Sequence, residues 1–358
     1  FGQVSQEHDD YTLPREIYSM TSIPTPLTFT HLRFQARART AIRLGEYQGA
    51  ERLRDALAQV MLRAVCPDPS TALRQAQGGS SGRRAETPSP EHAAVCPACW
   101  LLAAQTDPGA VRRVYSLAGQ QPPLDTLAQN QPFQFTITLF GNGFRFLPYF
   151  VLAASAMGDT GVGPGRGKFE IVSIHAQNPL TGASHAVLEA GEKIVRPQSL
   201  PIGWNEADAA ARELPSEADV RVRFLSPTRL IDSDSLVKAP DFGIFFRRLL
   251  ERVDELSKQH NGGERRPPEE VSELNQLADQ VRLIEQSTQW IELWGPSGRT
   301  GRSTPMSGFV GFAVYRSKHW DKLLPWLLLG QGVQVGKLTA KGNGVFQVEL
   351  PGRPGYWV

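Results

Sequence analysis

The sequence has 358 residues, of which 41% are hydrophobic and 21% are charged, a composition that is ordinary for a globular protein with two domains. Its longest apolar runs are too short to span a bilayer, so we expect no membrane contact. Three cysteines are too few for a disulfide framework, which favours a cytoplasmic protein.

The formal net charge of +2 hides an uneven distribution of charged residues. Basic residues outnumber acidic ones between His31 and Cys66 and again from Trp290 to the end, whereas acidic residues predominate in 206–285. Two basic ends around an acidic middle are what a polyanion-binding face would produce. Uneven surface charge without a function is the alternative.

The first half of the chain predicts a strand, a helix and a second strand. Residues 27–44 alternate apolar side chains with polar ones that include His31, which predicts a long strand with a basic outer face, ended by Gly45. Residues 51–65 place apolar side chains on one side of a predicted helix. Residues 67–91 are rich in Pro, Ser, Gly and Arg and predict a disordered insertion, and residues 133–139 alternate as another strand.

The second half predicts the same kinds of element in the same order. Residues 220–231 are expected to begin as a strand and to end in a Ser-Pro-Thr turn. An amphipathic helix is expected at 242–256, a second helix running to about Glu285, and a strand at 309–315. Each half then reads as β-α-β-β-α-β, the split unit of ferredoxin-like domains. We therefore expect an α+β fold of two tandem ferredoxin-like (RRM-like) domains, residues 1–200 and 201–358.

A segment of the first half reappears in the second half without a gap. Leu147–Val172 and Leu324–Glu349 each open with Leu-Pro-aromatic and close with Gly-x-Gly-x-Phe, and the same 22 positions separate the first Leu from the Phe. A helix, a glycine-rich loop and a strand repeated this far apart indicate one supersecondary unit duplicated in tandem.

Both copies of the loop combine glycine with basic side chains. Glycine permits positive φ angles and close approach to a ligand, so backbone amides in such a loop can face a phosphate. The second loop contains Gly336, Lys337, Lys341, Gly342 and Gly344, and the first contains Gly161, Gly163, Gly165, Arg166, Gly167 and Lys168. Turns that merely need glycine are the alternative. Neither loop is a dinucleotide fingerprint, because each follows a helix and precedes a strand.

Paired ferredoxin-like domains with a glycine-rich loop near the C-terminus resemble the repeat-associated (RAMP) proteins of CRISPR systems. The resemblance is greatest to the endoribonuclease that processes precursor CRISPR RNA, whose loop has Gly-hydrophobic-Gly, five residues including Lys or Arg, then Gly-hydrophobic-Gly. Here that register covers 334–344, with Gln334 in place of the first Gly and Asn343 in place of the second hydrophobic residue. The segments 224–228, 308–312 and 161–169 are also similar to the family.

The resemblance implies that the protein binds CRISPR repeat RNA and cleaves precursor CRISPR RNA without a metal. In that reaction the 2′-hydroxyl attacks the adjacent phosphorus and leaves a 2′,3′-cyclic phosphate and a 5′-hydroxyl, which needs a base, an acid and a cation. Family members commonly use a His near the first helix, but 51–65 contains none. We therefore assign His31, Tyr47 and Arg54 as catalytic candidates. The RNA-binding candidates are Arg52, Arg166, Lys168, Gly336, Lys337, Lys341, Gly342 and Gly344.

Two other functions remain open from the sequence. One is a non-catalytic RNA-binding subunit of a CRISPR effector complex, which the missing helix histidine favours, and the other is an interaction protein unrelated to nucleic acid. In both CRISPR hypotheses, subunits of an effector complex are possible partners.

Cys66, His92, Cys96 and Cys99 could form a three-Cys, one-His zinc site, since four such ligands suit structural zinc. The alternative is that the segment from Pro97 onward simply begins a buried helix. We assign no metal and no cofactor from the sequence.

Overall fold

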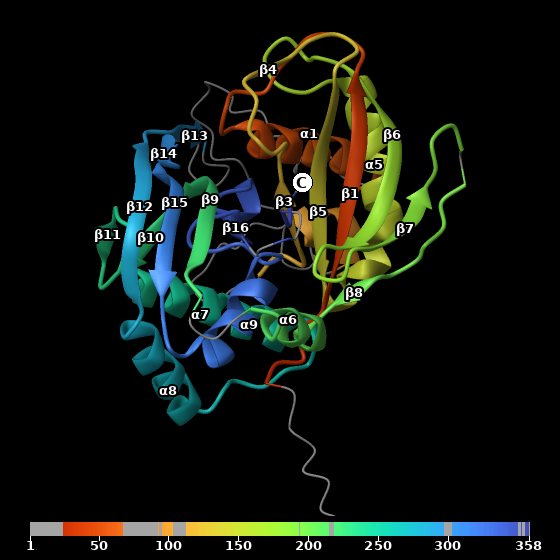
Figure 1. Ribbon diagram of the computed structural model, residues 1–358. Helices are drawn as coiled ribbons and strands as arrows, with labels where there is room; N and C mark the ends of the chain where they lie inside the picture. Colours follow the sequence, from red (N-terminus) through yellow and green to blue (C-terminus); the bar gives the residue numbers. More distant parts are fainter. Residues whose placement is uncertain are drawn as a thin grey trace, which may run out of the picture.

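Two antiparallel sheets, one from each half of the chain, form the frame of the protein (Figure 1). The computed structural model describes residues 24–66, 92, 95–102, 112–192, 194–214, 218–296, 303–349, 352 and 355–357. The insertion expected at 67–91 lies outside these residues. Among the described residues no helix is both long enough and apolar enough to cross a membrane.

The N-terminal sheet has the strand order of a split β-α-β-β-α-β unit. Its central strand β1 (Phe29–Ala38) pairs antiparallel with β5 (Pro132–Phe140) on one side and with β6 (Phe169–Asn178) on the other. Strand β3 (Tyr115–Ala118) extends the sheet beside β5, and β7 (Ala183–Leu188) extends it beside β6. The order β3-β5-β1-β6 is that of a ferredoxin-like sheet, so the predicted fold class is confirmed for this half.

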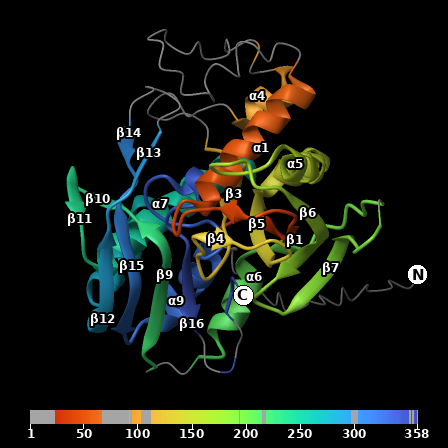
Figure 2. The ribbon, with the colours of Figure 1, turned by 90° about the horizontal axis from the view of Figure 1, so that it is seen from above.

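Helices α1 (Gly49–Val65) and α5 (Leu147–Thr160) lie on one side of this sheet (Figure 2). Apolar residues on the strands face these helices, and the rings of Phe34 and Phe135 stack at 4.8 Å between centroids. The short helix α4 (Pro97–Leu102) packs near the end of α1.

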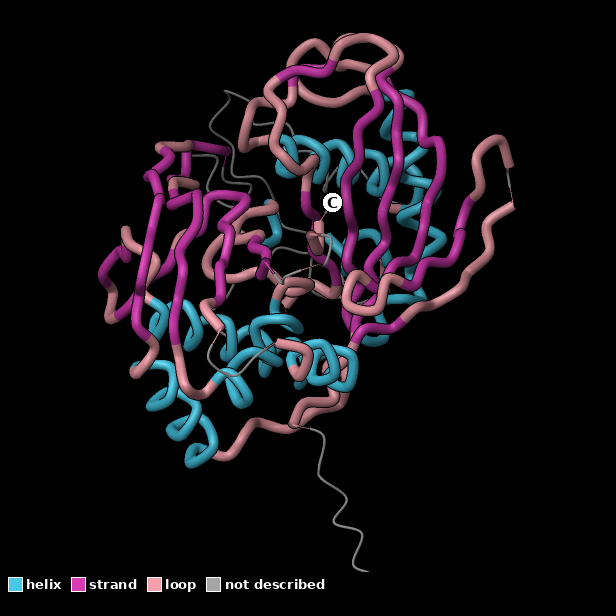
Figure 3. Tube along the Cα trace, in the orientation of Figure 1, coloured by secondary structure: helices cyan, strands magenta, loops and turns pink. Residues whose placement is uncertain are grey.

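The C-terminal sheet repeats the same order with its own helices. Strand β9 (Val220–Thr228) lies between β16 (Phe346–Glu349) and β15 (Gly308–Arg316), and β12 (Arg282–Ile291) forms the far edge. Helices lie along one side of this sheet, as Figure 3 shows in cyan. They are α6 (Trp204–Ala211), α7 (Phe242–His260), α8 (Pro268–Asp279) and α9 (Trp320–Gly330).

The duplicated segment occupies the same place in both units. Its first copy forms α5, a loop and β6, and its second copy forms α9, a loop and β16. Both strands begin at the Phe of the repeated motif, Phe169 and Phe346. The two copies are therefore the second helix and last strand of each unit, as the repeat predicted.

Two predicted element boundaries are wrong. The expected strand 27–44 ends at Ala38, and Ile42–Arg43 form a separate strand β2 that pairs with β4 (Thr126–Leu127). The helix expected to reach Glu285 ends at Asp279, because Arg282 already pairs with Arg316 of β15. Further short elements are η1 (Gly141–Phe146), β8 (Pro201–Ile202), β10 (Leu230–Asp232), β11 (Ser235–Val237), β13 (Trp294–Pro296), β14 (Ser303–Pro305) and η2 (Thr339–Lys341).

The two domains share an apolar interface. Phe29 and Phe140, from the N-terminal sheet, are buried with the core of the C-terminal domain. At the end of α7, the imidazole Nε2 of His260 lies 2.9 Å from the carbonyl oxygen of Arg112, and Asn261 donates to the hydroxyl of Thr28 at 2.9 Å. These contacts fix the position of one sheet relative to the other. A site lined by both domains is therefore already formed before a ligand binds.

Candidate functional site

The second glycine-rich loop lies between the two domains rather than on the outer surface. Gly342 has a φ of 86°, and a Cβ at this position would lie 2.1 Å from the Cβ of Ala50 in α1. Only glycine allows such close approach without displacing α1. Gly344 is buried as well, against the backbone of Val335. The expectation that Gly342 and Gly344 present free amides to a phosphate is therefore wrong.

The two departures from the family pattern have structural explanations. Gln334, which replaces a glycine, adopts a left-handed φ of 63°, and its side-chain amide donates to the carbonyl oxygen of Leu117 at 3.1 Å. Asn343 is buried and donates to the carbonyl oxygen of Met306 at 3.0 Å. Both side chains thus anchor the loop through hydrogen bonds that Gly or an apolar residue lacks.

Lys341 forms an ion pair with a carboxylate of the other domain. Its Nζ lies 2.7 Å from Oε1 of Glu51 in the first turn of α1, and the side chains are 12% and 5% exposed. The predicted role of Lys341 as a free RNA-binding cation is therefore wrong in this structure. Lys337 is exposed in the same loop, and Gly336 is half-buried against the carbonyl of Arg229.

His31 is fully buried, which contradicts its expected place on an exposed basic face. Its ring lies against Tyr356 and Trp357, with centroids 5.2 and 4.9 Å away, and Nδ1 is 3.2 Å from the hydroxyl oxygen of Thr138. Burial, and secondarily the charge of Arg33, lower the pKa of His31 to about 3. The imidazole is neutral and shielded by the C-terminal segment, so it is not placed to act on a substrate in solution.

Tyr47 lines a pocket between the domains. The pocket is small, with a cavity volume of about 20 Å³, and its lining includes Ala50, Gln120 and Tyr47 from the N-terminal domain and Ser226 and Gly342 from the C-terminal domain. Partial burial, followed by the neighbouring Glu46 carboxylate, raises the pKa of Tyr47. An ordinary tyrosine phenol, with a pKa of about 10, is already protonated at neutral pH, so Tyr47 is a hydrogen-bond and proton donor there.

The two arginines at the start of α1 have different surroundings. Arg52 is half-buried and donates to the carbonyl oxygen of Arg43 at 2.8 Å and to Oε1 of Gln48 at 2.7 Å, so it fixes the turn that carries Tyr47. Arg54 forms an ion pair with the adjacent Asp55, and its side chain is 17% exposed. Arg54 does not line the pocket.

The first glycine-rich loop does display its cations. Arg166 and Lys168 are exposed in the loop that connects α5 to β6, just before β6 begins at Phe169. The loop packs on the turn between β1 and β2, because the backbone carbonyl oxygen of Lys168 accepts hydrogen bonds from the amides of Arg39 and Thr40 and Gly163 lies against the carbonyl of Arg43. Exposed Arg43 is the last residue of β2, directly after that turn, and Arg39 in the turn pairs with Asp159 at 2.7 Å. This gives a cationic edge formed by Arg43, Arg166 and Lys168.

Sequence reasoning missed Glu46, Glu51, Gln120 and Ser226. They come from three parts of the sequence that are far apart, and no motif identifies any of them as a site residue, although Ser226 lies in the segment 224–228 that is similar to the family. The structure also brings Cys66, His92, Cys96 and Cys99 together at the C-terminal end of α1.

Comparison with known proteins connects this architecture to CRISPR systems. Residues 27–200 match the family AF_1859_N, an N-terminal domain, and residues 222–346 match the family described as CRISPR-associated endoribonuclease Cas6. No curated protein matches the chain.

Solved structures with the same fold include a Cas6 of Thermus thermophilus, with 15% identity, a TM-score of 0.51, and coverage of 90% of this chain and 99% of that one. A Cas6 product complex gives 15% identity and a TM-score of 0.52, covering 89% and 98%. A chain of a partial Cas6-RT-Cas1–Cas2 complex gives 12% identity and a TM-score of 0.57, covering 92% of this chain and 48% of that one. The tandem α+β architecture is therefore that of Cas6 proteins.

Replacing Lys341 with Met should destabilise the protein by about 3–5 kcal/mol, because it leaves the Glu51 carboxylate buried without the ammonium group. The double variant Glu51→Gln/Lys341→Met should recover part of that loss. Urea denaturation of each variant measures the free energy of unfolding.

Lys337→Met, an exposed change in the same loop, is the matched control and should alter stability by less than about 0.5 kcal/mol. Equal, small effects of Lys341→Met and Lys337→Met would contradict the assignment of a buried interdomain ion pair.

His31 should make the protein less stable in mild acid. The pKa of His31 is about 3 in the folded protein, and in the unfolded chain it has the ordinary histidine value of 6.5. Above pH 6.5 both states are neutral and nothing is lost. As the pH falls from 6.5 towards 3, the unfolded chain binds a proton that the folded chain does not, so stability falls by about 1.4 kcal/mol per pH unit.

Between pH 7 and pH 5 the wild type should therefore lose about 2 kcal/mol more stability than His31→Phe, which keeps a ring but does not titrate. Urea denaturation at both pH values gives the comparison, with exposed His185→Phe as the control that should follow the wild type. An identical pH dependence for His31→Phe and the wild type would show that His31 is accessible to protons.

Proposed function

We propose that this member of the Cas6 family of CRISPR-associated RAMP proteins binds CRISPR repeat RNA and cleaves precursor CRISPR RNA at its interdomain pocket. The observation that carries the proposal is the position of Tyr47 in a pocket lined by both domains of a Cas6-like fold. The N-terminal domain bearing that pocket also carries the cationic edge of Arg43, Arg166 and Lys168.

The proposed reaction is attack of the ribose 2′-hydroxyl on the adjacent phosphorus, with cleavage of the bond to the 5′-oxygen. It yields a 2′,3′-cyclic phosphate and a 5′-hydroxyl and needs no metal. Tyr47 donates its phenolic proton to the leaving 5′-oxygen. The exposed Glu46 carboxylate lines the same pocket and accepts the proton of the 2′-hydroxyl. Arg52, fixed in the same turn, supplies positive charge towards the phosphate.

RNA is proposed to contact the cationic edge and exposed Lys337. Arg166 and Lys168 lie on a loop whose backbone is hydrogen-bonded to the β1–β2 turn, which keeps both residues near Arg43. Their side chains are exposed. Such cations bind the sugar-phosphate backbone and supply much of nucleic-acid affinity. Other subunits of a CRISPR effector complex are proposed as protein partners.

A second candidate function is that of an RNA-binding subunit without nuclease activity. Its supporting observations are that α1 contains no His and that His31 is fully buried. Both functions predict tight binding of repeat RNA, so cleavage decides between them.

Tyr47→Phe should slow cleavage of labelled repeat RNA by about a hundredfold or more, since removal of a general acid has effects of this size. RNA binding should change little, because the aromatic ring remains. The assay is run with excess chelator during a brief incubation, and the wild type should still cleave. Its rate should be high at neutral pH and should fall above the ordinary tyrosine pKa of about 10, where the general acid loses its proton.

The control is Tyr149→Phe, which removes a phenolic hydroxyl from α5 outside the pocket and should cleave like the wild type. Tight RNA binding with no cleavage by the wild type over hours would establish the binding subunit instead. Full activity of Tyr47→Phe would remove Tyr47 from the mechanism.

Arg166→Ala/Lys168→Ala should weaken RNA binding and reduce the slope of log K against log salt by about 1–2, because two phosphate contacts are lost. The charge-matched control is Lys318→Ala/Lys322→Ala, which removes two exposed cations near the start of α9. Filter binding at several salt concentrations measures both slopes. Equal slopes for the two double variants would exclude the cationic edge from the RNA path.

A further inference from the structure

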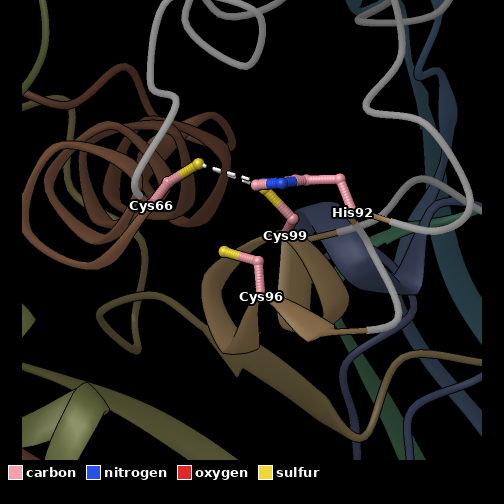
Figure 4. Close-up of side chains that lie close together, drawn as sticks. All are labelled: Cys66, His92, Cys96 and Cys99. Carbon is pink, nitrogen blue, oxygen red and sulfur yellow. Dashed lines mark hydrogen bonds between the residues drawn. The ribbon is translucent and has the colours of Figure 1, made fainter.

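Four potential metal ligands converge where α1 ends. Cys66 follows the last turn of α1, His92 lies beside it, and Cys96 and Cys99 flank the first residues of α4 (Figure 4). Cys96 and Cys99 are three positions apart at the start of a helix, so their side chains fall on the same face. Two segments that are separated in sequence by 67–91 therefore meet through these side chains.

The distances fit one ion held by all four residues. The four ligand atoms lie within 4.8 Å of one another. Sγ of Cys66 is 3.3 Å from Nε2 of His92 and 3.6 Å from Sγ of Cys99. Zinc bonds of about 2.3 Å to sulfur and 2.0 Å to nitrogen give tetrahedral edges of about 3.8 Å between sulfurs and about 3.5 Å between sulfur and nitrogen. A disulfide would instead require about 2.05 Å.

The kind and number of ligands select the metal. Three thiolates and one imidazole are soft and borderline donors, which suit Zn²⁺ and disfavour Mg²⁺ or Ca²⁺. The three cysteines are buried, and all four positions of a tetrahedron are filled by protein, so no position remains for substrate or water. Helical hydrogen bonds already orient the ligands: the amide of Cys66 donates to the carbonyl oxygen of Leu62 at 3.1 Å, and that of Cys96 donates to the carbonyl oxygen of His92 at 2.9 Å.

We propose that Cys66, His92, Cys96 and Cys99 bind one structural Zn²⁺ ion that fastens α4 to the end of α1. Binding displaces the thiol protons and forms bonds from three thiolates and one neutral imidazole to the metal. The ion joins Cys66 to Cys96 across the intervening chain, and because the site exists only in the folded state, its binding free energy adds to that of folding. This role is independent of RNA cleavage, because a filled coordination shell takes no part in the chemistry.

The test begins with the full chain purified without chelator. Metal analysis and native mass spectrometry should find one zinc ion per chain. The His92→Ala and Cys99→Ser variants should lose it, whereas His185→Ala, an exposed histidine outside the cluster, should retain it. Removing zinc from the wild type should lower Tm, since a ligand that binds only the folded state stabilises it.

Cobalt replacement provides a second measurement that does not depend on the variants folding. Co²⁺ in the wild type should give the intense visible bands of a tetrahedral thiolate site, and Zn²⁺ should displace it. Folded wild-type protein with no zinc and three titratable thiols would overturn the proposal. So would a disulfide between two of the cysteines, detected by intact mass, or retention of zinc by both His92→Ala and Cys99→Ser.

Discussion

The buried ion pair between Lys341 and Glu51 is the contact on which the candidate site depends. Removing both charges from water is costly. The pair joins α1 to the second glycine-rich loop, two segments that are far apart in the sequence. Glu51 lies one helical turn after Tyr47, and the loop of Lys341 continues to Val345, whose amide donates to the hydroxyl of Ser226 at 2.9 Å. The pair thus joins both walls of the pocket, one from α1 and one from β9.

The duplicated unit is used in two different ways. In the first copy, the glycine-rich loop packs on its own domain and leaves Arg166 and Lys168 in solvent. In the second copy, Gly342 allows the loop to approach α1 of the other domain, and Gln334 and Lys341 bind there. The first glycine-rich loop therefore exposes positive charge, whereas the second forms a contact between the domains. A single repeated motif does not imply a repeated function.

The sequence predicted the frame better than the site. Alternating strands and apolar helix faces depend on each residue's near neighbours, so both β-α-β-β-α-β units could be found. The same alternation placed His31 on the outer face of β1 correctly, but it carried no information that Tyr356 and Trp357 cover that face. Likewise, nothing near Lys341 in sequence indicates Glu51. The Cys-Pro-Ala-Cys spacing was visible, whereas the approach of Cys66 depends on how α4 packs against α1.

Helix α1 links these features mechanically. Its first turn carries Glu51 and Arg52 and follows Tyr47, and its last residues lead directly to Cys66. Its 17 residues span about 25 Å, and apolar residues from Leu53 to Leu62 are buried along its length. A helix packed in this way is held independently at each turn. Loss of the cysteine–histidine cluster should therefore loosen α4 and the end of α1, while the Glu51 contact continues to position Tyr47. The pocket and the cluster are two separate restraints on one rigid element.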